Sequence, residues 1–168
     1  MTAPLRRFLV IAGLMFWQGG FTFYGAVVVP VGQEVLGSHT NQGFITREVS
    51  NCLNLAGAII LSVLVWDAAV TRDHCRRRCR WRWFALFGLA VTLGLLVLLH
   101  LRLDKLLDAD AFRILDRKTF RREHRWYLWI STVQWGLALL YLLLTIWTWR
   151  GADRAAPERA GHQSGFPI

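Results

Sequence analysis

The sequence lacks the short motifs of the familiar soluble enzymes. It contains no nucleophile elbow, no phosphate-binding loop and no metalloprotease helix motif. It also lacks the amphipathic spread of a soluble fold, because its apolar residues, 54% of the 168, are gathered into long blocks with little charge. These absences argue against a soluble enzyme and point to membrane spans.

Four blocks have the length of a span: residues 8–31, 52–70, 83–101 and 126–149. A helix rises about 1.5 Å per residue, so roughly 20 residues cross a hydrocarbon core of about 30 Å. Because backbone groups in lipid must satisfy their own hydrogen bonds, each block is expected to be a helix. The sequence therefore predicts an all-α polytopic membrane protein, with a four-helix transmembrane domain over residues 1–150.

The start of the first block has a second interpretation. Arg6 and Arg7 resemble the basic region of a secretory signal peptide. However, the apolar stretch is too long for one, and no small-residue cleavage pattern follows it. We expect an uncleaved first span, with a cleaved signal as the alternative.

The formal net charge of +9 indicates orientation and not nucleic-acid binding, because the basic residues flank the spans. Between spans two and three lie Arg72, Arg76, Arg77, Arg78, Arg80 and Arg82. The positive-inside rule makes this loop cytoplasmic, with both termini on the same side. The loop of residues 32–51 agrees, since Arg47 is its one basic residue, whereas the third loop holds eight Lys or Arg. We predict a multi-pass protein of the cell (inner) membrane, with the lipid bilayer as its partner.

Two segments lie outside the spans. Apolar residues recur at helical spacing in the third loop, which predicts an amphipathic helical segment between helices three and four; they are Leu103, Leu106, Leu107, Ala111, Ile114 and Leu115. Residues 151–168 are small, polar and proline-bearing, and predict a disordered cytoplasmic tail.

Small residues predict how the first helix packs. Ala12, Gly19 and Ala26 fall at seven-residue intervals, and Gly20 lies beside Gly19. Helices in lipid associate through close approach at small residues and through polar bonds, so these positions form a candidate seam.

Two glutamines lie inside spans. Gln18 and Gln134 have nearly matching depths in an antiparallel pair, so they are candidates for a hydrogen bond across the bundle. Pro30 is expected to kink or end the first helix before Gly32.

Aromatic residues mark both ends of the fourth span: Trp126, Tyr127, Trp129, Trp147 and Trp149. They match the aromatic belts of membrane interfaces, and we interpret them as anchors; stacking on a ligand is the less favoured alternative.

Cysteine is scarce, with three in the chain. His74, Cys75 and Cys79 offer metal-ligating atoms, but no further ligand is adjacent and the surrounding arginines repel a cation, so we expect no metal site. With Cys52 in a span and the other two in a cytoplasmic loop, structural disulfides are not expected.

His100 and His124 end span three and begin span four, and they are the candidate cofactor-binding residues. Five polar residues are expected on the same side: Glu34, His39, Glu48, Asn51 and Asn54. Such a cluster can bind haem, a metal ion or a proton, but interfacial groups facing water are the simpler interpretation. We expect no cofactor, with haem or a metal ion as the alternative.

Three stretches carry a family resemblance: "WQGGFTFYGAVVVPVGQEVLG", "QGFITREVSNCLNLAG" and "FRREHRWYLWISTVQWGLALL". They resemble the transmembrane protein 205-like family of small four-helix membrane proteins. The resemblance covers all four spans and implies this fold; the family's molecular function is unresolved, although one animal member is linked to resistance against platinum drugs. Residues 17–30 are more weakly similar to copper-resistance membrane proteins with a Trp-Gly-Gly pattern, but Gln18 interrupts that pattern and methionine clusters are missing.

Two functions remain. The first is a non-enzymatic bundle that supports transport, metal or drug tolerance, or the assembly of other membrane proteins, as a homo-oligomer or with such partners. The second is a haem- or metal-linked membrane oxidoreductase that uses His100 and His124.

Overall fold

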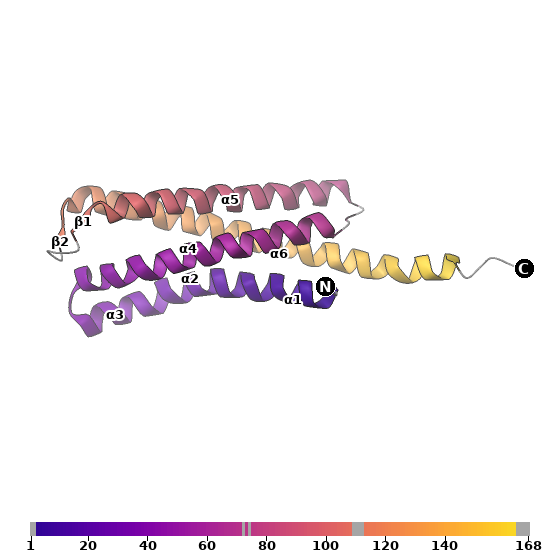
Figure 1. Cartoon of the computed structure of the whole chain (residues 1–168), viewed down its shortest axis with the longest axis horizontal. Coiled ribbons are helices and arrows are strands. Elements are labelled where there is room, and N and C mark those ends of the chain that lie inside the picture. Colours follow the sequence, from indigo (N-terminus) through magenta and orange to yellow (C-terminus); the bar gives the residue numbers. More distant parts are fainter. Residues whose placement is uncertain (1–2, 72, 74, 109–112, 164–168) are drawn as a thin grey trace, which may run out of the picture.

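The computed structural model describes residues 3–71, 73, 75–108 and 113–163. Helices dominate this part of the chain (Figure 1). In chain order the elements are α1 (Ala3–Leu14), η1 (Met15–Gly19), α2 (Gly20–Phe23), η2 (Tyr24–Val28), α3 (Val29–Leu36), α4 (His39–Val70), α5 (Arg76–Asp104), β1 (Leu107–Asp108), β2 (Arg113–Ile114) and α6 (Arg117–Gln163).

The predicted fold class is confirmed. Within the described residues four helical segments are long and apolar enough to cross a membrane: Ala3–Leu36, Asn41–Val70, Arg76–Asp104 and Arg117–Arg154. Each contains one of the predicted apolar blocks and extends beyond it. The four segments lie side by side as an elongated bundle (Figure 1).

The first segment is one helical path from α1 to α3 that contains two π-helical turns, η1 and η2. Pro30 lies in the first turn of α3, directly after η2. A proline is tolerated within this continuous helical path because a local π-helical turn such as η2 can accommodate the hydrogen bond that the proline cannot make. The helix therefore continues past Gly32, where the sequence predicts a kink or an end, and stops at Gly37, whose φ of 59° suits glycine.

The connection between α5 and α6 differs from the predicted amphipathic helix. Leu107 pairs with Ile114 and Asp108 with Arg113, so β1 and β2 form a small antiparallel hairpin. The Leu115 backbone N–H closes it by donating to the Leu106 carbonyl at 3.0 Å. A hairpin reverses the chain within a few residues, which suits two antiparallel helices whose ends lie close together. Ala111 of the predicted helix lies outside the described residues.

Helix α6 begins at a capped end and continues beyond the bundle. The Asp116 carboxylate accepts the backbone N–H groups of Lys118 and Thr119 at 2.9 and 3.1 Å. The hydrogen bond from the Thr119 hydroxyl, together with these backbone bonds, holds the Asp116 pKa below its usual value. At the other end α6 runs to Gln163, whereas the sequence predicts disorder from residue 151. Alanine and arginine favour helix in this stretch despite Pro157.

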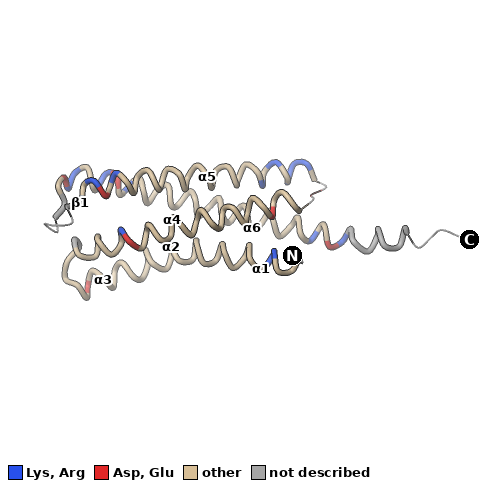
Figure 2. Tube along the Cα trace, in the orientation of Figure 1, with Lys and Arg blue, Asp and Glu red and all other residues tan. Residues whose placement is uncertain are grey.

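The two ends of the bundle differ in which segments they collect. The start of α1, the α4–α5 connection and the C-terminal half of α6 share one end, which we call the terminal end (Figure 1). The α3–α4 and α5–α6 connections share the other, which we call the hairpin end. Charged residues gather towards these ends, and long uncharged stretches separate them (Figure 2).

The first segment packs against α4, but through a different face from the predicted seam. Large side chains fill the interior, and Trp17 lies fully buried against Gly57 of α4, where an added Cβ would come within 2.5 Å of the ring. Of the predicted residues, Gly20 faces Leu53 of α4, whereas Ala12 is half-buried and Gly19 and Ala26 are exposed. Gly57 lets the Trp17 ring pack closely on α4, so the small residue that admits the close contact belongs to the neighbouring helix and not to the first segment.

Candidate functional site

A charged cluster is buried at the terminal end. It consists of Arg6, Asp67, Thr71 and Arg82, and we call it the Asp67 cluster. The Asp67 carboxylate is fully buried and lies 2.8 Å from Arg6 Nε and 3.2 Å from Arg82 Nη2. Thr71 completes it, because its hydroxyl donates to Asp67 at 3.0 Å and accepts from Arg6 Nη2 at 3.0 Å.

The Asp67 cluster holds two cations and one anion, so its formal charge is +1. Arg82 is 2% exposed, and removal of such a charge from water is costly unless neighbouring groups compensate. The Tyr141 ring provides part of this compensation, with the Arg82 guanidinium 5.8 Å from its centroid. The Tyr141 hydroxyl donates to the Leu64 carbonyl at 2.9 Å, which fixes the ring between α4 and α6.

Ion pairs around this cluster tie the chain termini to the bundle. Arg7 donates two bonds to Asp153, at 2.6 and 2.8 Å, and its guanidinium lies 5.4 Å from the centre of the Trp149 ring. These contacts join α1 to α6. They place the start of the chain and its C-terminal helix on one side of the bundle.

Asp73 makes the corresponding link from the α4–α5 connection. It accepts two bonds from Arg78, at 2.6 and 2.7 Å, and one from the Thr148 hydroxyl of α6 at 2.9 Å. Burial by itself raises the Asp73 pKa, but the bonds from Arg78, the Cys75 backbone N–H and Thr148 outweigh burial and lower the pKa below its usual value. The carboxylate form is therefore the one that the fold stabilises.

Polar side chains recur along the buried face of α6. Tyr127, Gln134, Tyr141 and Thr148 recur at seven-residue intervals, and all four are buried. With Thr145, which is also buried, they form what we call the α6 stripe. A seven-residue repeat keeps one face of a helix towards its neighbours, so these side chains line the interior from one end to the other.

Several interior side chains have hydrogen-bonding atoms without a partner in the described part of the chain. The N–H donors among them include Trp17 Nε1, Gln18 Nε2, Asn54 Nδ2 and Gln134 Nε2, with Trp149 Nε1 and the Nε atoms of Arg7 and Arg82 at the terminal end. The Tyr127 hydroxyl faces Ser50 and Asn54 but completes a hydrogen bond with neither. The Asn54 carbonyl oxygen is the one acceptor-only atom of this unpartnered set. The interior is therefore rich in donors, and buried donors normally have partners.

A second charged group lies at the hairpin end. Arg47 Nε of α4 is 3.0 Å from the Asp104 carboxylate of α5, and His100 Nε2 is 3.6 Å from the other oxygen of the same group. Nearby, Gln42 donates to the Tyr24 hydroxyl at 3.3 Å, which donates to Thr46 at 3.1 Å. Charged groups thus close both ends of the polar interior.

The predicted histidine pair does not come together through any contact in the described residues. His100 is buried and faces Asp104. His124 is exposed on α6 and stacks on Phe120, with ring centroids 6.2 Å apart. His100 therefore lies on a buried face of its helix and His124 on an exposed face of its own.

The predicted bond between Gln18 and Gln134 is also missing. Both side chains are buried, as expected, but neither amide nitrogen has a partner in the described part of the chain. Matching depth was not sufficient, because the two amides must also point at one another across a packed interior.

The cysteines form no metal site in the described residues, and the predicted aromatic belt is only partly exposed. Cys75 is exposed, and both it and Cys79 are free, while His74 lies outside the described residues. No group of three metal-ligating side chains occurs among residues that the structure describes. Of the predicted belt, Trp126, Trp129 and Trp147 are exposed as anchors require, whereas Tyr127 and Trp149 belong to the interior.

The sequence interpretation missed Asp67 and Arg82. Asp67 is the one carboxylate within residues 52–70, and an ionisable residue inside a span marks a functional site by default. The positive-inside rule treats Arg82 as one of the loop arginines. Its position one residue before an apolar block was a signal that it enters the bundle.

Comparison of the chain with protein-family models, with curated proteins and with solved structures finds no match.

Proposed function

We propose that this chain is a non-enzymatic integral membrane protein that carries a small anion through its four-helix bundle. The observation that supports it best is the set of unpartnered N–H donors inside the bundle, from Trp17, Gln18, Asn54 and Gln134. Buried polar groups within membrane helices mark substrate and ion pathways. An interior that offers donors and few free acceptors complements an anion.

The charge of the terminal end agrees with this choice. The Asp67 cluster has two arginines for one carboxylate. At the same end of the bundle, the first turns of α5 carry three further arginines that are exposed: Arg76, Arg77 and Arg80. An excess of fixed positive charge raises the local concentration of anions at such a mouth. The α6 stripe then offers hydroxyl and amide groups along the length of the bundle.

The protein lies in the cell (inner) membrane with its terminal end in the cytoplasm, and the positive-inside rule supports this orientation. Membership of the transmembrane protein 205-like family is supported by the three sequence stretches quoted above. Assembly as a homo-oligomer or with other membrane proteins is compatible with this orientation and with this family.

Chloride efflux from liposomes tests the function. Purified full-length chain is reconstituted into vesicles loaded with potassium chloride, and valinomycin sets the potential that drives chloride out past an ion-selective electrode. We expect efflux well above that of protein-free vesicles. In Gln134→Leu it should fall by about tenfold or more, because a hydrogen bond to a charged group contributes about 1.5–3 kcal/mol.

Thr132→Val is the matched control, since Thr132 lies exposed on the same helix and, within the described residues, its hydroxyl bonds only to the Leu128 carbonyl. Its efflux should equal that of the wild type. The proposal fails if the wild type conducts no better than empty vesicles, or if both variants lose the same activity while remaining monodisperse and helical. The polar interior would then serve helix packing alone.

A further inference from the structure

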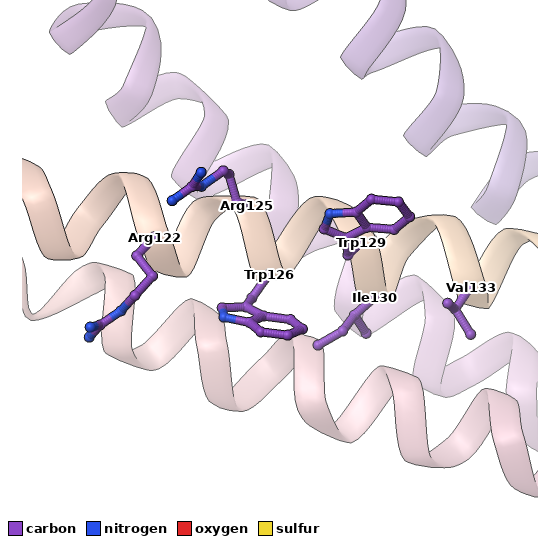
Figure 3. Close-up of a pocket in the computed structure, with 6 residues that line it drawn as sticks. All are labelled: Arg122, Arg125, Trp126, Trp129, Ile130 and Val133. Carbon is purple, nitrogen blue, oxygen red and sulfur yellow. The ribbon is translucent and has the colours of Figure 1, made fainter.

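A groove lies on the outer face of α6 near the hairpin end (Figure 3). Its volume is about 540 Å³, and its lining residues are Arg122, Arg125, Trp126, Trp129, Ile130 and Val133. All six project from α6 in Figure 3. The groove is separate from the polar interior, because Trp126, Trp129 and Val133 are exposed on the surface of the bundle.

The lining changes in chemistry along the helix. Two arginines stand at its start, two tryptophans follow, and Ile130 and Val133 end it. Arg122 and Val133 are eleven positions apart, which is about 16 Å of helix and about the depth of one leaflet. The order of cation, indole and aliphatic side chain is the order of headgroup, interface and acyl chain in a lipid monolayer.

The two arginines are available to a ligand. Arg125 has no ion pair or hydrogen bond within the described residues, and Arg122 has a loose contact of 3.6 Å with its neighbour Glu123. The two arginines are one helical turn apart on α6 and lie on either side of its ribbon in Figure 3, and arginine donates paired hydrogen bonds to the oxygens of a phosphate.

We propose that this groove binds one anionic phospholipid. Its phosphate is held by Arg122 and Arg125, its glycerol region lies against the indole rings of Trp126 and Trp129, and an acyl chain follows Ile130 and Val133. A second copy of the chain is the poorer occupant, because docking groove against groove opposes like charges. The proposal is independent of anion transport, since it uses none of the interior residues.

Native mass spectrometry of the full-length chain in detergent measures the binding. Phosphatidylglycerol, phosphatidylcholine and inorganic phosphate are added in separate titrations. We expect phosphatidylglycerol to bind more tightly than the other two. Arg122→Gln/Arg125→Gln should weaken it roughly thirtyfold, because each basic residue near an anionic surface contributes a factor of about five.

Arg117→Gln/Arg121→Gln is the matched control, since it removes the same charge from exposed positions on the same helix that do not line the groove. It should leave phosphatidylglycerol binding within about twofold of the wild type. If the two double variants lose phosphatidylglycerol affinity equally, the binding reflects general surface charge, and the proposed site is wrong. Equal affinity for phosphatidylcholine, tight binding of phosphate alone, or a dimer that disappears with Arg122→Gln/Arg125→Gln would each overturn it as well.

Discussion

At the residue scale, the Asp67 carboxylate is shared by two arginines that come from different helices. Arg6 reaches it from α1 and Arg82 from α5. Removal of its charge leaves two guanidinium groups facing each other in a buried site. A buried charge without its partner is strongly destabilising, whereas the intact pair is close to neutral in net stability.

We therefore predict that Asp67→Asn lowers the free energy of unfolding by about 3–5 kcal/mol. The measurement is the loss of helical circular dichroism on heating in detergent. Asp153→Asn is the control: Asp153 also pairs with an arginine of α1 but is 58% exposed, so its replacement should change stability little. Equal midpoints for the two variants would contradict a structural role for Asp67.

The glycine at position 57 gives a steric prediction. A Cβ on Gly57 would lie 2.5 Å from the buried Trp17 ring, whereas a Cβ on Gly94 meets nothing within 4 Å. Gly57→Ala should destabilise the bundle by about 1–3 kcal/mol, the usual cost of overpacking. Gly94→Ala should leave stability unchanged or raise it slightly. Thermal unfolding in detergent distinguishes them, and a neutral Gly57→Ala would mean that the ring does not lie in this contact.

Asp73 gives a pH prediction outside the spans. Because its pKa is lowered in the folded state, its contribution to stability is full above the unfolded value of about 3.9 and is lost as the pH falls through the folded pKa. The difference in unfolding temperature between wild type and Asp73→Asn should therefore shrink between about pH 5 and pH 3. A difference that stays constant over this range would show that the carboxylate charge is not what links the α4–α5 connection to α6.

At the element scale, the spans were predictable because length and hydropathy alone define them. The side of each helix that faces its neighbours was not predictable. The predicted Gln18–Gln134 bond and the predicted Ala12–Gly19–Ala26 seam are wrong for this reason. In a span that is apolar all round, hydropathy does not identify the buried face, and the π-helical turns η1 and η2 disturb a count by heptads. The α5–α6 hairpin was mistaken for a helix because the spacing of Leu107 and Ile114 fits both.

Crosslinking between elements tests these facings. Ile60 side-chain carbons lie 2.7–3.4 Å from the Cβ position of Gly13, so Gly13→Cys/Ile60→Cys should form a disulfide between α1 and α4. His100→Cys/His124→Cys should not, because one side chain is buried and the other exposed. Both pairs are placed in a chain whose native cysteines are replaced by serine, and maleimide labelling after denaturation counts the free thiols. Efficient disulfide formation in His100→Cys/His124→Cys would contradict this expectation and support the shared site that the sequence predicts.

At the scale of the whole molecule, the terminal end gathers charge from four segments. Arg6 and Arg7 come from α1, Asp67 from α4, Arg82 from α5 and Asp153 from α6. These contacts place the N-terminus, the α4–α5 connection and the C-terminal half of α6 on one side of the bundle. Any experiment that locates one of them therefore locates the other two.

The positive-inside rule predicts that this side is cytoplasmic, because the arginine-rich start of α5 resists translocation across a membrane that is negative inside. Reporter fusions at the C-terminus should then give cytoplasmic signals, whereas insertions at residues 37–42 should report from the opposite side. Replacing Arg76, Arg77 and Arg80 together with glutamine should weaken this bias, while the buried Arg82 stays in place to hold Asp67. A cytoplasmic signal from residues 37–42 in the wild type would reverse the orientation. The anion pathway would then have its positive mouth on the outer side, and the lipid groove would lie in the cytoplasmic leaflet.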